Sequence, residues 1–235
     1  YVNSELLHIH EHVFVKANLP KRVARVADVA PILRGLITAA GKRVIMNFRT
    51  NAKVRSFVDG REVRRYSQKS TVTPDHVIRT KPKPLIVPAP DASDLKSFTK
   101  AAKRALDSYQ KSYNNYFERQ NKRVGYSKTK LDLLPRIILV PGLGLFGLDE
   151  NSKSAEIVAD LAETNVDVIT DCESISSYQA IPENDVFDIE YWSLEQAKIG
   201  KKSTNLLISK ICVVSGGGSG IGAATARAFS RQGSE

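Results

Sequence analysis

Residues 135–150, PRIILVPGLGLFGLDE, decide the expected fold because they predict two buried strands joined by a tight turn. The short apolar run at 137–140 is typical of a strand that is covered on both faces. Pro141 and Gly142 then favour a turn, and the glycine-spaced run at 144–149 predicts a second strand, as in a hairpin. We therefore expect a sheet built around this pair.

The segments on either side of this pair alternate between helical and strand patterns. Downstream, a helix is predicted to start near Ser152–Ser154, with an apolar stripe that needs a sheet to pack on: Ile157, Val158, Leu161, Ala162, Val166 and Ile169. One more short helix is predicted within 178–202. Upstream, the patterns predict a helix at 28–39 that stops at Gly41, a strand at 43–48 and a helix at 51–58. This alternation predicts the α/β class.

Five prolines exclude a continuous helix across residues 70–90, where we expect an ordered loop with a short strand at 85–87. The longest helix should follow, with Ser93 or Asp94 as its N-cap and apolar residues at helical spacing: Leu95, Phe98, Ala102, Leu106, Tyr109, Tyr113, Tyr116 and Phe117. Strand and helix patterns recur at the C-terminus, with a predicted strand at 206–215 and a helix after it.

The composition is that of a soluble globular chain: 235 residues, 42% hydrophobic and 26% charged. No apolar run reaches the roughly 18 residues of a membrane span, so we expect a cytoplasmic protein without a membrane partner. The two cysteines, Cys172 and Cys212, have no metal-ligand spacing and are expected to be reduced. The chain starts with tyrosine, and we expect it to be a piece of a longer protein.

Charge is distributed unevenly along the chain. Residues 1–130 hold 27 Lys and Arg against 10 Asp and Glu, whereas residues 131–235 hold 8 against 15. A basic half of this kind can bind nucleic acid or an acidic partner. It can also be a solvated surface, and scattered basic residues without an uninterrupted block favour that interpretation.

The glycine cluster SGGGSGIG at 215–222 lies between the last predicted strand and the last helix. Glycines here allow a backbone to approach a pyrophosphate at a helix N-terminus, where free amides favour negative charge. The cluster resembles the start of short-chain dehydrogenases, Thr-Gly-x-x-x-Gly-Ile-Gly, with Ser215 in place of the threonine. The resemblance implies NAD or NADP as cofactor, held by Ser215, Gly216, Gly218, Ser219, Gly220, Ile221 and Gly222.

The same resemblance places the remaining dehydrogenase residues beyond Glu235: the residue that selects NAD or NADP, the catalytic serine and Tyr-x-x-x-Lys. One Tyr-x-x-x-Lys does occur, from Tyr126 to Lys130, but it precedes the glycine loop and is interpreted as coincidence. No catalytic residue is therefore predicted in this chain.

The segment HIHEH at 8–12 is a candidate metal site, since His8 and His12 would share one face of a helix, and His8, His10 and His12 one face of a strand. No third-ligand partner is evident elsewhere, because His76, the one remaining histidine, lies in the proline-rich loop. A histidine-containing helix without metal is the favoured interpretation.

The body of the chain resembles bifunctional class II aldolase/short-chain dehydrogenases of the rhamnulose-1-phosphate aldolase/alcohol dehydrogenase kind. TPDHVIRTKPKPL, LPRIILVPGLGLFG and EYWSLEQAK occur in the expected order, and the resemblance covers 29–233. It implies three parts: the end of a catalytic aldolase region at 1–28, a degenerate aldolase-like α/β/α domain at 29–200, and a truncated Rossmann start at 201–235. The aldolase zinc would be held by upstream residues, so no metal ligand is assigned here.

Within that resemblance, residues 140–169 look like a second copy of an aldolase element, with Leu143 at the place of a metal-binding histidine. Leucine cannot bind zinc, so 29–198 is predicted to be a metal-free repeat. The idea requires the strand at 137–140 to lie in a sheet flanked by helices.

The loop TPDHVIRTKPK could bind an anion through His76, Arg79, Lys81 and Lys83, or use these side chains structurally; both interpretations stay open.

These observations predict a fragment of a sugar-metabolising enzyme that is inactive by itself. Its parent would cleave a deoxy-ketose phosphate, convert the aldehyde product with NAD or NADP, and form a homo-oligomer; nucleic acid is not an expected partner. The alternative is a non-enzymatic basic module for nucleic acid or an acidic partner.

Overall fold

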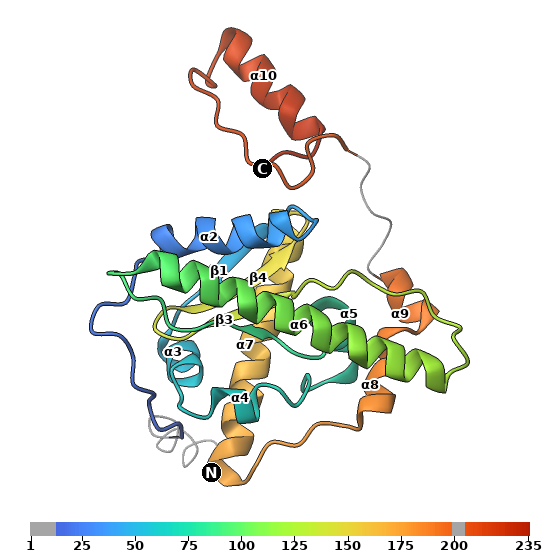
Figure 1. Ribbon diagram of the computed structural model, residues 1–235. Coiled ribbons are helices and arrows are strands. Elements are labelled where there is room, and N and C mark those ends of the chain that lie inside the picture. Colours follow the sequence, from blue (N-terminus) through green and yellow to red (C-terminus); the bar gives the residue numbers. More distant parts are fainter. Residues whose placement is uncertain (1–12, 199–204) are drawn as a thin grey trace, which may run out of the picture.

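The computed structural model describes residues 13–198 and 205–235, and its centre is a four-stranded mixed sheet (Figure 1). The strand order is β1-β4-β3-β2, formed by β1 (Ile45–Arg49), β4 (Gly144–Asp149), β3 (Ile137–Val140) and β2 (Leu85–Ile86). β4 pairs antiparallel with both β1 and β3, and β2 joins β3 in parallel. The predicted hairpin at 135–150 therefore forms the two central strands.

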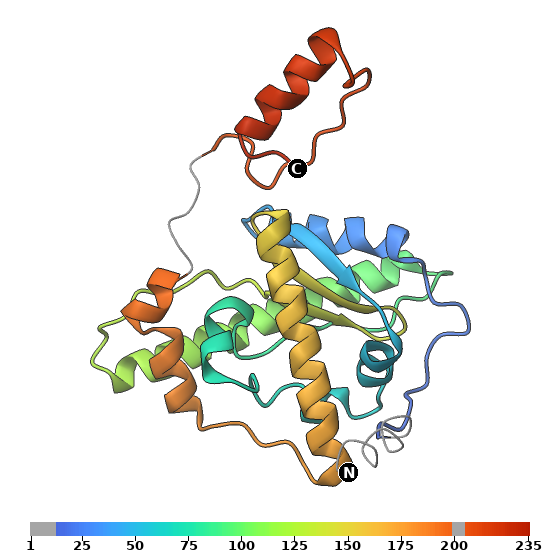
Figure 2. The ribbon, with the colours of Figure 1, turned by 180° about the vertical axis from the view of Figure 1, so that it is seen from behind.

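Helices cover both faces of this sheet. One face packs against α2 (Val26–Ala39) and α6 (Leu95–Arg123), the other against α3 (Ala52–Val58) and α7 (Ser152–Ile175), which crosses the sheet diagonally in Figure 2. The result is an α/β/α sandwich. The strand at 137–140 thus lies in a sheet flanked by helices, as the repeat hypothesis requires, while the hypothesis itself stays a prediction.

The two central strands divide their side chains between the two layers. Ile138 and Val140 of β3 join the cluster with α2 and α6, whereas Ile137 and Leu139 join the cluster with α3 and α7. This alternation is the period of two expected when both faces of a strand are covered. It explains why the run at 137–140 is apolar throughout rather than alternating.

Capping residues define where the helices begin. The Asp94 carboxylate accepts a hydrogen bond from the Ser97 amide at 2.9 Å, which selects Asp94 over Ser93 as the N-cap of α6. Asn51 and Asn151 cap α3 and α7 in the same way. At 29 residues, α6 is the longest helix in the described part of the chain, as predicted.

The segment between β1 and β2 contains more helix than the sequence predicts. Residues 70–90 contain a 3-10 turn, η2 (Pro74–His76), followed by α5 (Val77–Thr80), because the amides of 77–80 lie between prolines and remain free to bond. The short helix α4 (Val63–Tyr66) precedes this segment. The single helix predicted within 178–202 is two helices, α8 (Glu183–Glu190) and α9 (Ser193–Lys198).

The predicted strand at 206–215 is wrong. These residues form turns and unpaired extended backbone, followed by α10 (Gly220–Arg231). Their amides bond to the end of the chain instead: Leu207 donates to the Gln232 carbonyl and Cys212 to the Glu235 carbonyl. A strand is stabilised by a neighbouring strand, and the described residues place none beside 206–215.

Among the residues that the structure describes, no helix combines enough length with enough hydrophobicity to cross a membrane. The HIHEH segment, with the histidine-containing helix that is the favoured interpretation of it, lies outside the described residues. Phe14 is described, and its ring packs against Phe57 and Tyr66 with centroids 5.6 and 4.3 Å away.

Candidate functional site

A groove of about 890 Å³ runs between α6 and the proline-rich segment that carries β2. Pro82, Pro84 and Pro88 line it beside Leu85 and Ile86, and one side of α6 lines it from Ala101 to Arg119. Arg64 of α4 and residues 68–70 after it close another side. Ile181, Glu183 and Val186 close the end near α8. The groove therefore lies where four separate segments of the domain meet.

The lining of this groove is strongly basic. Six cationic side chains line it against a single carboxylate: Arg64, Lys69, Lys83, Arg104, Lys111 and Arg119. The carboxylate, Glu183, accepts two hydrogen bonds from one guanidinium nitrogen of Arg119, at 2.7 and 2.8 Å. Burial raises the pKa of Glu183, but hydrogen bonds from Gln120 and Arg119, together with the charges of Arg119 and Lys83, bring it below its ordinary value. One carboxylate faces six cations, so the lining of the groove carries a net positive charge.

Two hydroxyl groups that line the groove lack hydrogen-bond partners. The Ser70 hydroxyl is buried in a residue that is 8% exposed, and the Tyr109 hydroxyl is also buried; neither has a partner among the described residues. Burial raises the pKa of Tyr109, so this hydroxyl stays protonated at neutral pH and can donate. Unpaired buried hydroxyls are uncommon in native proteins, because desolvation costs about 1–3 kcal/mol each.

Ser70 also has an unusual backbone. Its φ is +108°, a conformation that costs a non-glycine residue roughly 1–3 kcal/mol. Its carbonyl accepts a hydrogen bond from the Tyr178 hydroxyl at 3.3 Å, which helps to hold the chain in this position. A strained residue with an unused hydroxyl at a groove wall is a candidate binding residue.

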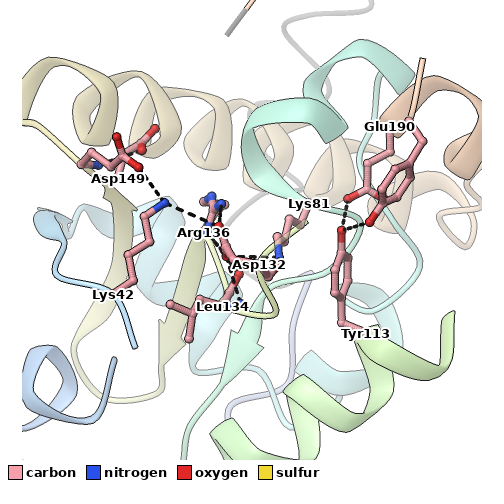
Figure 3. Close-up of polar contacts among 10 residues, drawn as sticks. Lys42, Lys81, Tyr113, Asp132, Leu134, Arg136, Asp149 and Glu190 are labelled. Carbon is pink, nitrogen blue, oxygen red and sulfur yellow. Dashed lines mark hydrogen bonds and ion pairs between the residues drawn. The ribbon is translucent and has the colours of Figure 1, made fainter. Parts of the chain in front are cut away.

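A buried charge network begins just before the N-terminal end of β3 (Figure 3). The Arg136 guanidinium donates to both oxygens of Asp132, at 3.0 and 2.6 Å. Lys42 lies 3.5 Å from Asp132 and 3.0 Å from Glu150. Burial alone would raise the pKa of Asp132, yet Arg136 and the two lysines hold it well below its ordinary value. Asp132 is therefore ionised at neutral pH.

Lys81 connects Asp132 to the aromatic part of the network. It is 3% exposed, and its ammonium group lies 3.6 Å from an Asp132 carboxylate oxygen and 3.8 Å from the centre of the Tyr113 ring. It also donates to the Asp132 carbonyl. Burial lowers the pKa of Lys81 to about 7, and the charge of Arg136 adds to this, while Asp132 opposes it.

Glu190 is the buried acid at the other end of the network, with an exposed fraction of 0%. Its two oxygens accept hydrogen bonds from Tyr113 at 2.7 Å and Tyr116 at 2.9 Å, and Tyr113 also contacts the Tyr191 hydroxyl at 2.9 Å. Burial raises the pKa of Glu190 to about 7, and the tyrosine hydrogen bonds oppose that rise. Tyr113 and Tyr116 line the groove as well, so they connect the network to it.

The structure separates the basic residues of TPDHVIRTKPK. Lys81 faces the buried network, whereas Lys83 lines the groove. The Nδ1 atom of His76 is buried without a partner among the described residues, and Arg79 does not line the groove. Lys81 therefore has the structural use that the sequence left open, and a single anion site formed by all four residues is wrong.

The glycine loop contains two glycines with positive φ and one close backbone contact. Gly216 and Gly220 have φ of +68° and +53°, and a Cβ on Gly222 would lie 2.2 Å from the Gly216 carbonyl oxygen. The loop leads into α10, whose N-terminal amides lack a side-chain cap from Ser219. Six of the seven predicted cofactor residues are exposed, all except the half-buried Gly222: Ser215, Gly216, Gly218, Ser219, Gly220 and Ile221. Positive φ and the missing side chains would allow a phosphate to approach the loop, although the described residues place no strand beside it.

No zinc site is found in the described residues, where no group of three or more His, Cys, Asp or Glu side chains could hold a metal ion. Leu143, at the position of the expected ligand, packs against the cluster between the sheet and α2 and α6. Its carbonyl accepts a hydrogen bond from the Thr50 hydroxyl at 2.8 Å. The residues here do not fit zinc, and HIHEH lies outside the described part.

Sequence reasoning missed the groove and Glu190. A signal for Glu190 exists, because it lies three and four residues after the buried Phe187 and Val186 and so on the apolar side of α8. The groove had no such signal, since its residues come from segments that the sequence does not place together.

The sandwich and its basic groove define a mixed α/β domain. Residues 24–199 match the family model described as "Aldolase class II, second domain", and the chain belongs to this family. It is 26% identical over 215 residues to a Bacillus subtilis (strain 168) protein named "Uncharacterized oxidoreductase YuxG". That match covers 91% of this chain but 31% of the relative, so the chain spans about a third of its length. No solved structure matches.

Proposed function

We propose that the chain is the connecting part of a bifunctional sugar-metabolising enzyme that joins an aldolase to a dehydrogenase. The observation that carries this proposal is the order of units: a class II aldolase second domain at 24–199, followed by a glycine loop that opens a helix at 220. The longer relative is named an oxidoreductase, which supports a dehydrogenase part. Because the family match begins at residue 24, we assign the residues before it to the end of the catalytic aldolase region.

The proposed parent enzyme cleaves a deoxy-ketose phosphate such as rhamnulose 1-phosphate and converts the aldehyde product with NAD or NADP. Zinc would polarise the substrate carbonyl in the aldolase part, on residues outside those described here. In the dehydrogenase part, Gly216, Gly220 and Gly222 would let the cofactor pyrophosphate approach the first turn of α10. A cytoplasmic homo-oligomer is part of this proposal.

In this scheme the sandwich domain is a non-catalytic connector. Leu143 cannot bind a metal, which supports a role in packing. Exposed apolar side chains around the glycine loop support further strands beside it in the parent enzyme: Leu206, Ile211, Val213 and Ile221 are 80%, 58%, 94% and 88% exposed. Side chains of this type would be covered in a complete dinucleotide-binding sheet.

The test compares the purified 235-residue chain with the product of the longer coding sequence. We expect no NADH-dependent reduction of lactaldehyde and no cleavage of rhamnulose 1-phosphate by the 235-residue chain, and both activities in the longer protein. Reduction of lactaldehyde by the 235-residue chain would contradict the proposal, as would a longer protein that lacks both activities.

The excess of cations over carboxylates in the groove favours one alternative, a basic module that binds nucleic acid. That function predicts retention on DNA with a steep dependence on salt, because each neutralised phosphate releases a counterion. Chromatography on immobilised DNA at two salt concentrations distinguishes the two functions, since an enzyme connector should elute at low salt.

A further inference from the structure

We propose that the groove between α6 and residues 82–88 binds a small organic phosphate, meaning a phosphate monoester attached to a compact carbon skeleton. This site lies apart from the glycine loop, and the assignment does not depend on the proposed dehydrogenase or aldolase activities. It is carried by the charges, the unused hydroxyls and the shape of the groove.

The charges come from three segments of the domain. Arg64 lies on α4, Lys83 lies in the proline-rich segment, and Arg104 and Lys111 lie on α6. None of the four takes part in an ion pair or side-chain hydrogen bond found for the described residues. Lys69 donates to the Tyr178 carbonyl, and its charge also helps to lower the pKa of Glu173, so this charge is partly compensated. Like charges held around one groove repel one another, and a bound dianion would relieve that repulsion.

The hydroxyls supply the second, independent observation. Ser70 is 8% exposed, its hydroxyl has no partner among the described residues, and its backbone is held at a φ of +108°. It lines the groove next to Lys69. A phosphoryl oxygen would accept the hydrogen bond that this hydroxyl can donate, and Lys and Arg would supply the charge-assisted bonds.

The shape and the remaining lining select a small molecule over a polymer. A volume of about 890 Å³ lies within the usual range of ligand pockets, roughly 300–1,000 Å³. Apolar side chains line it beside the cations: Leu85, Ile86, Ala101, Ala105, Ile181 and Val186. β2 is the edge strand here, but the prolines around it lack amide donors, which disfavours an added peptide strand. A carbon skeleton can contact the apolar part while its phosphate contacts the cations.

The experiment is a calorimetric titration of the 235-residue chain with fructose 1-phosphate, fructose and inorganic phosphate. We expect saturable binding of fructose 1-phosphate, weaker binding of inorganic phosphate and none of fructose. Binding of inorganic phosphate as tightly as fructose 1-phosphate would overturn the organic part of the assignment. No saturable binding of either phosphate up to about 10 mM would overturn the site.

A matched pair of double variants tests the location. Arg104→Gln with Lys111→Gln removes two charges from the groove side of α6, whereas Lys96→Gln with Lys122→Gln removes two exposed charges of the same helix that do not line the groove. The groove pair should raise the Kd at least about tenfold, and the control pair should change it less than about twofold. An equal rise of the Kd in both double variants would show that the attraction is non-specific, and it would overturn the assignment.

Ser70→Gly separates binding from folding. Glycine adopts positive φ without strain, so the melting temperature should stay the same or rise, while loss of the hydroxyl should raise the Kd several-fold. An unchanged Kd in this folded variant would overturn the role of Ser70.

Discussion

Glu190 shows how one side chain can make stability depend on pH. Both of its oxygens accept hydrogen bonds from tyrosines, yet complete burial raises its pKa to about 7 from an ordinary value of 4.5. Between these two pH values the unfolded chain has released the proton and the folded chain still holds it. Stability contributed by this group is therefore present below pH 4.5 and is lost as the pH rises toward 7.

We predict that Glu190→Gln removes this loss. Urea unfolding of the native chain and the variant at several pH values should show the native chain losing up to about 3 kcal/mol relative to the variant between pH 4.5 and 7. Glu156→Gln, at an exposed position of α7, is the control and should follow the native profile. A constant difference between native chain and Glu190→Gln across this range would show that Glu190 titrates normally.

Lys81 should give the opposite slope at higher pH. Burial lowers its pKa to about 7 from 10.5, so the unfolded chain holds a proton that the folded chain has released, and stability should rise with pH across this window. Lys81→Met should flatten that rise in the same unfolding experiment. A native profile that falls from pH 7 to 10, and is unchanged by Lys81→Met, would contradict the assignment.

At the scale of elements, one glycine sets the distance between β4 and α7. A Cβ on Gly147 would lie 2.5 Å from the Ala159 amide nitrogen and 2.7 Å from the Ala155 carbonyl oxygen. These atoms belong to the helix backbone and cannot move aside as a side chain would. The close approach also explains the small residues Ala155, Ala159 and Ala162 on the sheet-facing side of α7.

Gly147→Ala should therefore destabilise the domain by about 3 kcal/mol or more, since overpacking here meets backbone on both sides. Gly35→Ala is the matched control, because Gly35 lies within α2 with no atom within 4 Å of the added Cβ. That variant should gain about 0.5–1 kcal/mol from helix propensity. Thermal unfolding of both variants measures the contrast; equal effects would mean that the helix and sheet can separate at little cost.

At the scale of the whole molecule, residues 205–235 contribute little to the main core. The buried residues of the three hydrophobic clusters in the described part lie between Ala24 and Tyr191. The C-terminal residues contact the sandwich through a few polar bonds, including Arg34 to the Ser209 carbonyl at 3.0 Å and the Ser209 hydroxyl to the Glu150 carbonyl at 2.7 Å.

Removing residues 205–235 should lower the melting temperature by no more than about 6 °C, because a few such bonds contribute about 1 kcal/mol each. Calorimetry of the full and shortened chains should show one cooperative transition in both. A much larger drop in melting temperature, or the loss of the cooperative unfolding transition, would mean that the C-terminal residues are part of the sandwich.

The sequence by itself determined the elements that depend on local pattern. The 3.6-residue spacing of apolar side chains predicts α2, α6 and α7, and Asp94 is among the predicted caps of α6. The apolar run at 137–140 predicts the buried central strand. These features depend on residues that are near neighbours in the sequence. The same reasoning predicted a strand at 206–215 that is not formed, since strand formation depends on a partner that local pattern cannot supply. The glycine-loop residues stay a predicted cofactor site.

Only the tertiary structure decided what lies across long separations. The parallel pairing of β2 with β3 joins residues separated by the whole of α6, and the bond from Tyr113 to Glu190 spans 77 positions. Burial gives Glu190 and Lys81 their shifted pKa values, and packing brings cations from three segments to one groove. Burial and convergence are properties of the packed chain, so no local pattern contains them.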